Sequence, residues 1–86
     1  MPTIAIFYGI SVRMYYDDHS PAHIHVYYAS HAAKFTIETG DLIAGNVPGR
    51  VESMVHEWTL LNKVQLLENW QRSLRHEPLL PVAPLE

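Results

Sequence analysis

The chain has 86 residues, 48% hydrophobic and 17% charged, with a formal net charge of −3 at pH 7, which is typical of one folded domain and excludes a disordered chain. It has no cysteine, which excludes disulfides and thiolate zinc sites, so any bound metal would need nitrogen and oxygen ligands. The six basic residues are scattered rather than clustered, so we expect no direct nucleic-acid binding by this protein alone.

Residues 1–45 show the alternation of apolar and polar positions that is typical of β-strands. Even-numbered positions from Ile4 to Tyr16, Ile6 among them, are apolar, which predicts one strand or two short strands kinked at Gly9. Alternating segments follow at 23–28 and 33–39, and a short apolar segment lies at 40–45. The sequence predicts an antiparallel meander of three to four strands with one buried face.

Residues 46–76 change to helical spacing and predict two helices. Asn46 is the expected N-cap of the first helix, with Pro48 in its first turn. Asn62, followed by Gln65, resembles a capping box and predicts a bend between the helices. The residues expected to form its hydrophobic staple are Leu61 and Leu66, and those expected on the inner faces are Val51, Met54, Val55, Trp58, Leu61, Leu66, Leu67, Trp70 and Leu74.

Residues 77–86 contain three prolines between Pro78 and Pro84 and predict an extended apolar arm. Its leucines and valine need a surface to contact, either on this domain or on a neighbour. The fold class expected from the whole pattern is a single α+β domain, in which two C-terminal helices pack against one face of the sheet.

The first residues, MPTIAIFYG, lack the charged region and cleavage site of a signal peptide. The longest apolar runs fall well short of the roughly 20 residues that a membrane span needs. We therefore expect a cytoplasmic protein that does not enter a membrane.

The segment DDHSPAHIHV, residues 17–26, brings two carboxylates and three histidines together. His23 and His25 are two positions apart on a predicted strand, so their rings project from one face, a spacing that suits one metal ion. His19 is a candidate third ligand, and Asp18 is a candidate to orient an imidazole. Three protein ligands with an open position are typical of catalytic zinc and other divalent metal sites, with zinc, manganese and iron as candidates.

Two other interpretations of the cluster remain open at this point. The histidines and Asp18 are also the residue types of metal-free acid–base catalysis. Alternatively, His19 caps the turn while His23 and His25 make structural hydrogen bonds or contact a partner. The sequence has no G-x-S-x-G elbow and no phosphate-binding glycine loop, so serine hydrolase and P-loop chemistry are excluded.

The run FYGISVRMYYDDHSPAHIHVYY resembles the opening of a group of small bacterial proteins, the domain of unknown function 4160 family. Its pattern is close to F-x-G-I-x-I-x-M-[YF]-x-x-D-H-x-P-P-H-F-H-V. Ala22 and Ile24 depart from that pattern, and all three histidines are in place. The matching residues are Phe7, Gly9, Ile10, Met14, Tyr15, Asp18, His19, Pro21, His23, His25 and Val26.

The resemblance implies a partner rather than a reaction. Proteins of this group are typically encoded beside another small protein, in an arrangement similar to a toxin–antitoxin pair. The expected function is therefore one half of such a two-protein module, which contacts its partner through a sheet edge or the arm from Pro78 to Leu85, with a homodimer as a further possibility. The alternative is a metal-dependent hydrolase or nuclease that uses His19, His23 and His25.

Overall fold

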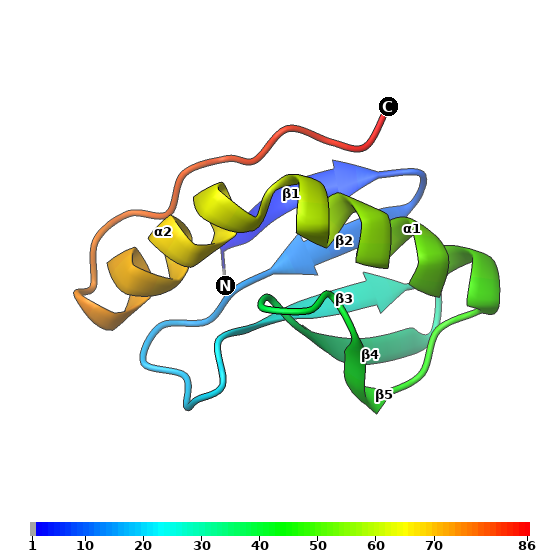
Figure 1. Cartoon of the computed structure of the whole chain (residues 1–86), viewed down its shortest axis with the longest axis horizontal. Helices are drawn as coiled ribbons and strands as arrows, with labels where there is room; N and C mark the ends of the chain where they lie inside the picture. Colours follow the sequence, from blue (N-terminus) through cyan, green and yellow to red (C-terminus); the bar gives the residue numbers. More distant parts are fainter. Residues whose placement is uncertain (1) are drawn as a thin grey trace.

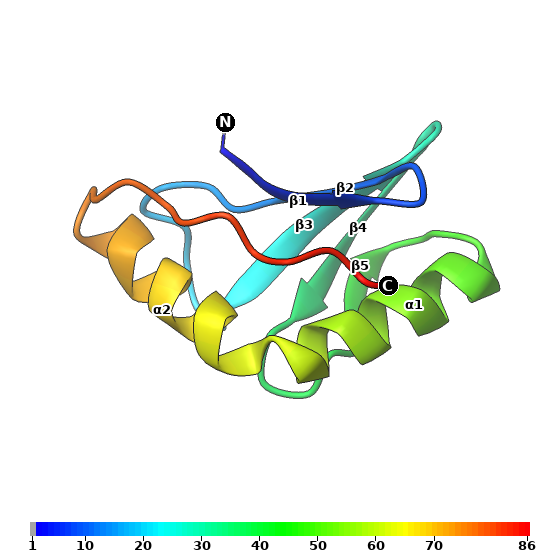
Figure 2. The same ribbon diagram turned by 90° about the horizontal axis from the view of Figure 1, so that it is seen from above.

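Five antiparallel strands form one layer of the computed structural model, which describes residues 2–86. Their order in the sheet follows the chain, so each strand pairs with the next along the sequence. Two helices and the C-terminal segment cover one face of this sheet (Figure 1), and the two layers are seen side by side in Figure 2. The elements are β1 (Thr3–Phe7), β2 (Ile10–Arg13), β3 (His23–Tyr28), β4 (His31–Thr36), β5 (Leu42–Gly45), α1 (Gly49–Leu61) and α2 (Lys63–Leu74).

This arrangement confirms the predicted α+β fold, with five strands where three to four were expected. The difference lies at Tyr8 and Gly9, which both have positive φ, 51° and 78°. Two successive residues of this kind make a tight hairpin that matches the twist of its strands. The first apolar segment is therefore two strands, β1 and β2, which confirms the second of the two alternatives that the sequence left open at Gly9.

The sequence predicted that the side chain of Ile6 in β1 points to the buried face. This prediction is wrong, because Ile6 is 65% exposed. The pairing of β1 with β2 shifts register between Thr3 and Ala5, which is a bulge in the strand. A bulge changes which face later side chains point to, so Ala5 and Phe7 join Ile4 in the core while Ile6 points outward.

The helices bend at Asn62 as expected. Asn62 is also the N-cap residue of α2, although its side chain makes no capping bond, whereas the predicted cap of α1 at Asn46 is wrong. The N-cap of α1 is Pro48, and Asn46 Oδ1 instead accepts a hydrogen bond from Nδ1 of His31 at 3.0 Å. Asn62 Nδ2 donates to the Trp58 carbonyl at 2.9 Å and makes no capping bond to α2. Leu61 is exposed, so the expected staple with buried Leu66 is not formed.

On the inner face of α2, Asn69 and Ser73 are buried beside Leu66 and Trp70, and Leu74 is 43% exposed. Asn69 belongs inside because its side chain holds the C-terminal arm: Nδ2 donates to the Leu80 carbonyl at 2.8 Å and Oδ1 accepts from the Leu80 N–H at 2.9 Å. The Ser73 hydroxyl donates to the Trp70 carbonyl.

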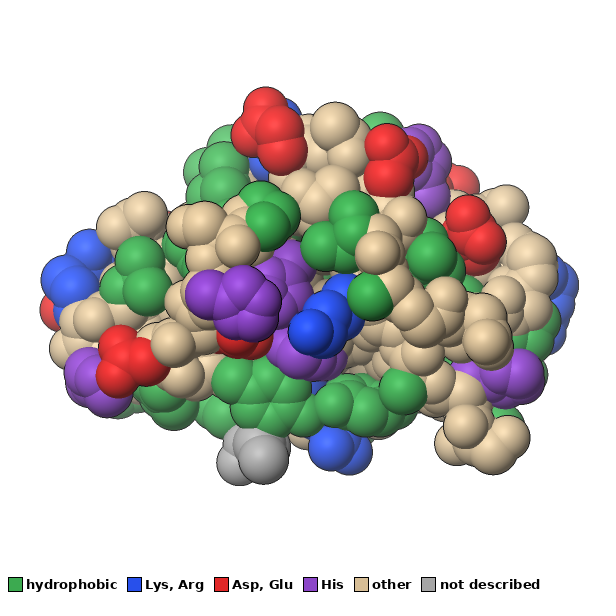
Figure 3. Space-filling view, turned by 90° about the horizontal axis from the view of Figure 1, so that it is seen from below, with side chains coloured by type: hydrophobic (Ala, Val, Ile, Leu, Met, Phe, Trp, Pro, Cys, Tyr) green, Lys and Arg blue, Asp and Glu red, His purple; other side chains and the backbone are tan. Residues whose placement is uncertain are grey.

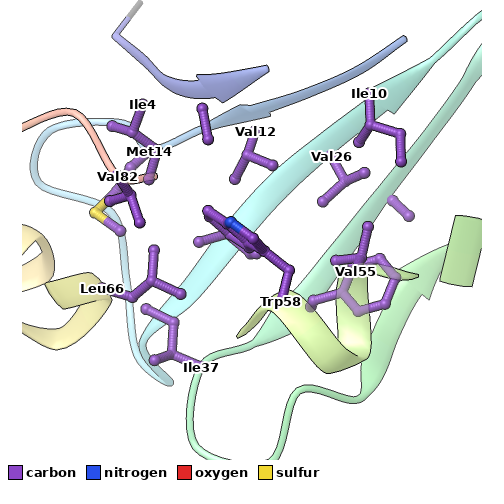
Figure 4. Close-up of a cluster of buried hydrophobic side chains, with 14 of the residues drawn as sticks. Ile4, Ile10, Val12, Met14, Val26, Ile37, Val55, Trp58, Leu66 and Val82 are labelled. Carbon is purple, nitrogen blue, oxygen red and sulfur yellow. The ribbon is translucent and has the colours of Figure 1, made fainter. Parts of the chain in front are cut away.

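The arm after α2 lies between β1 and the helices of its own domain (Figure 2). The Val82 N–H donates to the Ile4 carbonyl at 2.9 Å, and Trp58 Nε1 donates to the Ala83 carbonyl at 2.7 Å. Val82 is buried in the core around Trp58 (Figure 4). Within residues 2–86, no helix has the length and hydropathy of a membrane span.

Candidate metal centre

The loop between β2 and β3 folds back over the start of β3 and places Asp18 against two histidines. Asp18 Oδ2 lies 2.9 Å from His25 Nε2 and 3.0 Å from His23 Nε2. His23 and His25 project together because they are alternate residues of one strand. Figure 3 shows histidine side chains gathered around an acidic one on this side of the molecule, with Lys or Arg side chains beside them.

His23 is the buried member of the group, with 2% of its side chain exposed. Its Nδ1 lies 2.7 Å from the Pro21 carbonyl, and since a carbonyl oxygen only accepts, Nδ1 carries a proton. Its ring also packs against Trp70, with centroids 5.4 Å apart. These two contacts fix the orientation of the ring. Because Nδ1 carries a proton, Nε2 is the nitrogen without one in the neutral imidazole.

That nitrogen, His23 Nε2, is buried and makes no hydrogen bond within residues 2–86. It approaches Asp18 Oδ2 without the alignment of a hydrogen bond. A bare imidazole nitrogen facing a carboxylate oxygen places two lone pairs against each other, which is unfavourable in a buried place. A cation between the two atoms removes the conflict.

His25 is the second nitrogen donor, with 14% of its side chain exposed. Its Nε2 hydrogen-bonds Asp18 Oδ2, and the edge of the Tyr15 ring contacts its imidazole, with centroids 4.3 Å apart. Burial lowers the pKa of His25; the hydrogen bond to Asp18 raises it, and the nearby His23 and Lys34 lower it further, so that the net shift is downward. The depressed pKa favours the neutral ring that a metal requires, and binding of a metal at Nε2 would require the proton now shared with Asp18 to lie on Nδ1 instead.

Asp18 is ionised throughout the ordinary pH range. Burial raises the pKa of its carboxyl, but the hydrogen bonds from His25 and from the His19 backbone, together with the two imidazoles, outweigh burial and lower the pKa to about 2. Its second oxygen, Oδ1, accepts the His19 N–H at 2.9 Å. The carboxylate is therefore both charged and held in place.

The donor atoms of Asp18, His23 and His25 all lie within 4.8 Å of one another. Two ligands on one zinc ion in tetrahedral geometry are about 3.4 Å apart, given metal–ligand bonds near 2.1 Å. The distances of 2.9 and 3.0 Å from the carboxylate oxygen to the two nitrogens are a few tenths of an ångström shorter than this. Small side-chain movements are enough to admit an ion.

His19, the candidate third ligand from the sequence, is placed differently. Its side chain is 78% exposed, and Nδ1 lies 3.1 Å from the outer oxygen of Asp18. The structure thus brings His23 and His25 together with Asp18, and leaves His19 outside the converging set. In the sequence, Asp18 lies directly before His19, and either side chain could have joined His23 and His25. The conformation of the loop determines that Asp18 points toward them and His19 points away.

Comparison with known proteins gives one finding. Residues 9–71 match the model of a protein family described as Domain of unknown function (DUF4160). Comparison with curated proteins gives no match. Comparison with solved structures gives none either.

Proposed function

Because the chain belongs to this family, whose description names no activity, we propose from the geometry that it is a metal-dependent hydrolase. Asp18, His23 and His25 would hold one divalent ion, with zinc, manganese and iron(II) as the candidate metals. The observation that supports the proposal most is the buried Nε2 of His23, which faces the Asp18 carboxylate without a hydrogen bond.

The set of two imidazoles and one carboxylate fits such an ion. The Pro21 carbonyl holds His23 in the tautomer that presents Nε2, which is the usual way a second contact orients a histidine ligand. Tyr15 and the sheet hold His25. Asp18, His23 and His25 would hold such an ion, which would supply activation of water and polarisation of the scissile bond.

The test is metal content and affinity of untagged protein after dialysis against zinc, manganese or iron(II). We expect about one ion per chain, and Asp18→Asn should weaken binding more than about 100-fold, since even groups that only orient a ligand contribute about 10–100-fold. Hydrolysis of activated esters should fall with it. Asn has nearly the same shape as Asp, so the variant should remain folded.

His19→Ala is the matched control. His19 lies near the outer oxygen of Asp18, and its ring centroid is 5.7 Å from that of His23, but it is outside the converging set of donor atoms. The variant should therefore keep metal affinity within about tenfold, the lower limit for the loss of an orienting contact. Wild-type protein that takes up no metal would contradict the proposal. Equal losses in His19→Ala and Asp18→Asn would instead assign the site to the three histidines.

A second candidate function, which we also propose, is that of one half of a toxin–antitoxin-like module. It is favoured by the edge strand β5, which within residues 2–86 pairs only with β4 and has Ile43 47% exposed. The opposite edge, at β1, already receives the Val82 N–H of the arm. An extended segment of the small protein encoded alongside would add to β5 as a further strand.

Substitution of Ile43 by lysine tests this second function. A lysine on an edge strand disfavours strand addition, so Ile43→Lys should weaken the complex with the neighbouring gene product at least about tenfold. Ile6→Lys places the same charge on β1, where Ile6 is 65% exposed, and should leave the affinity unchanged. Calorimetric titration of the purified pair measures both, and equal affinities for Ile43→Lys and wild type would refute strand addition at β5.

A further inference from the structure

The sheet places two unpaired cationic side chains on either side of His25. In the strand register, Arg13 of β2 and Lys34 of β4 are the two residues directly opposite His25 of β3. Residues directly opposite each other in neighbouring strands project from the same face. Arg13, His25 and Lys34 therefore form one row across the sheet.

The charges of this row are not neutralised within the domain. Among residues 2–86, Lys63, Arg72 and Arg75 form ion pairs with glutamates. The remaining three of the six basic residues, Arg13, Lys34 and Arg50, have no carboxylate within 4.0 Å, and two of them flank His25. Such a concentration of free positive charge beside one histidine suits an anion.

Arg13 is held in position by an aromatic ring. Its guanidinium carbon lies 4.5 Å from the centroid of Tyr27, whose hydroxyl is hydrogen-bonded to that of Tyr15 at 2.6 Å. The Arg13 Nε is buried and has no hydrogen-bond partner within the described chain. A stacked guanidinium with free donors is a common means of binding phosphoryl oxygens.

A pocket of about 220 Å³ opens beside His25 and Lys34 of this row. Arg13 does not line the pocket itself, but its guanidinium is stacked on the ring of Tyr27, which does. It is lined by His25, Tyr27 and Lys34 together with the small residues Ala32, Ala44 and Gly45. The small side chains leave space above the sheet, while the charged and aromatic ones border it. His25 is shared, so a group seated in the pocket lies next to the candidate metal centre.

From this geometry we propose that the pocket is an anion subsite that takes the phosphoryl group of a phosphate ester, with Arg13 and Lys34 binding its oxygens. The inference deepens the proposed hydrolase function by naming its substrate class, and the hydrolysis step rests on that function. Water attacks phosphorus, the bond from phosphorus to the ester oxygen breaks, and the alcohol leaves with a proton. Binding of the anion itself does not depend on the metal.

The first experiment is titration of inorganic phosphate, with and without zinc, into wild type and Arg13→Met/Lys34→Met. We expect the double variant to bind phosphate at least about tenfold more weakly in both conditions. Arg50→Met removes one positive charge from the first turn of α1, on the helical layer, as Lys34→Met does from the sheet, and should bind within about twofold of wild type. Should the double variant not fold, Lys34→Met alone is the test, with about a threefold loss expected.

The second experiment compares metal-loaded protein on a phosphodiester, a phosphomonoester and an uncharged carboxylic ester of nitrophenol. The double variant should lose turnover of the two phosphate esters and keep that of the carboxylic ester. No phosphate binding by wild type, or equal losses in Arg50→Met and the double variant, would overturn the subsite. If the protein takes up metal but binds no phosphate, the anion subsite is wrong and the hydrolase proposal stands. If it binds phosphate but takes up no metal, the hydrolase proposal is wrong and the anion subsite stands.

Discussion

Replacing Trp58 with alanine is expected to lower the free energy of unfolding by about 3–5 kcal/mol. Trp58 is fully buried at the centre of the core, where its ring centroid lies 5.2 Å from that of Phe7 (Figure 4). Loss of a buried tryptophan side chain costs about 3–5 kcal/mol. A domain of this length has a total stability of roughly 4–13 kcal/mol, so the variant loses between about a quarter of that stability and all of it.

Trp58 has a second role that increases this effect. Its Nε1 donates to the Ala83 carbonyl, so the substitution also removes a bond that holds the arm in place. Denaturant unfolding followed by circular dichroism measures the difference. The control is Leu61→Ala, three residues away and 67% exposed, which should change the unfolding free energy by no more than about 0.5 kcal/mol. Similar stabilities of the two variants would contradict the central position of Trp58.

Addition of zinc is the second large effect that we expect, as a rise in melting temperature. Metal that binds only the folded state at 100 times its dissociation constant adds about 2.7 kcal/mol of stability. For a domain of 60–100 residues, 1 kcal/mol corresponds to about 4–8 °C, so the expected rise is about 10–20 °C. The stabilisation arises because the ligands come from both the β2–β3 loop and β3.

His23→Ala should abolish this rise, because it removes the ligand whose nitrogen is buried and unpaired. His31→Ala removes a histidine from the opposite end of the β3–β4 hairpin and should leave the rise intact. Differential scanning calorimetry of the three proteins at equal zinc concentration makes the comparison. A rise of the same size in His23→Ala would show that zinc stabilises the fold from another place.

The sequence was informative wherever periodicity decides the structure. Alternation in β3 correctly predicted that His23 and His25 share a face, and helical spacing predicted two helices with a bend at Asn62. These features depend on local chain geometry, in which side chains repeat every 2 or 3.6 residues.

Features that depend on loop conformation or tertiary contact were not predictable in this way. The bulge near Ile4 exchanges the buried and exposed positions in the rest of β1, and no residue at that position predicts a bulge. Asp17 has a positive φ of 56°, and this turn leads the chain into the conformation that directs Asp18 toward the histidines and His19 outward. The Asn46 side chain is hydrogen-bonded to His31 and does not cap α1. This contact joins segments that are far apart in the sequence, so local patterns do not predict it.

The bond between Ile4 and Val82 also has a consequence for the order of folding during synthesis. Residues 3–45 contain the whole sheet and emerge before the helices and the segment that closes the β1 edge. At a synthesis rate of about 5–20 residues per second, the sheet waits roughly 2–8 s for the helices and the arm. During that interval its apolar face and its first edge are both uncovered, so newly made chains are most prone to aggregate, or to be recognised by chaperones, before residue 82 has joined the structure.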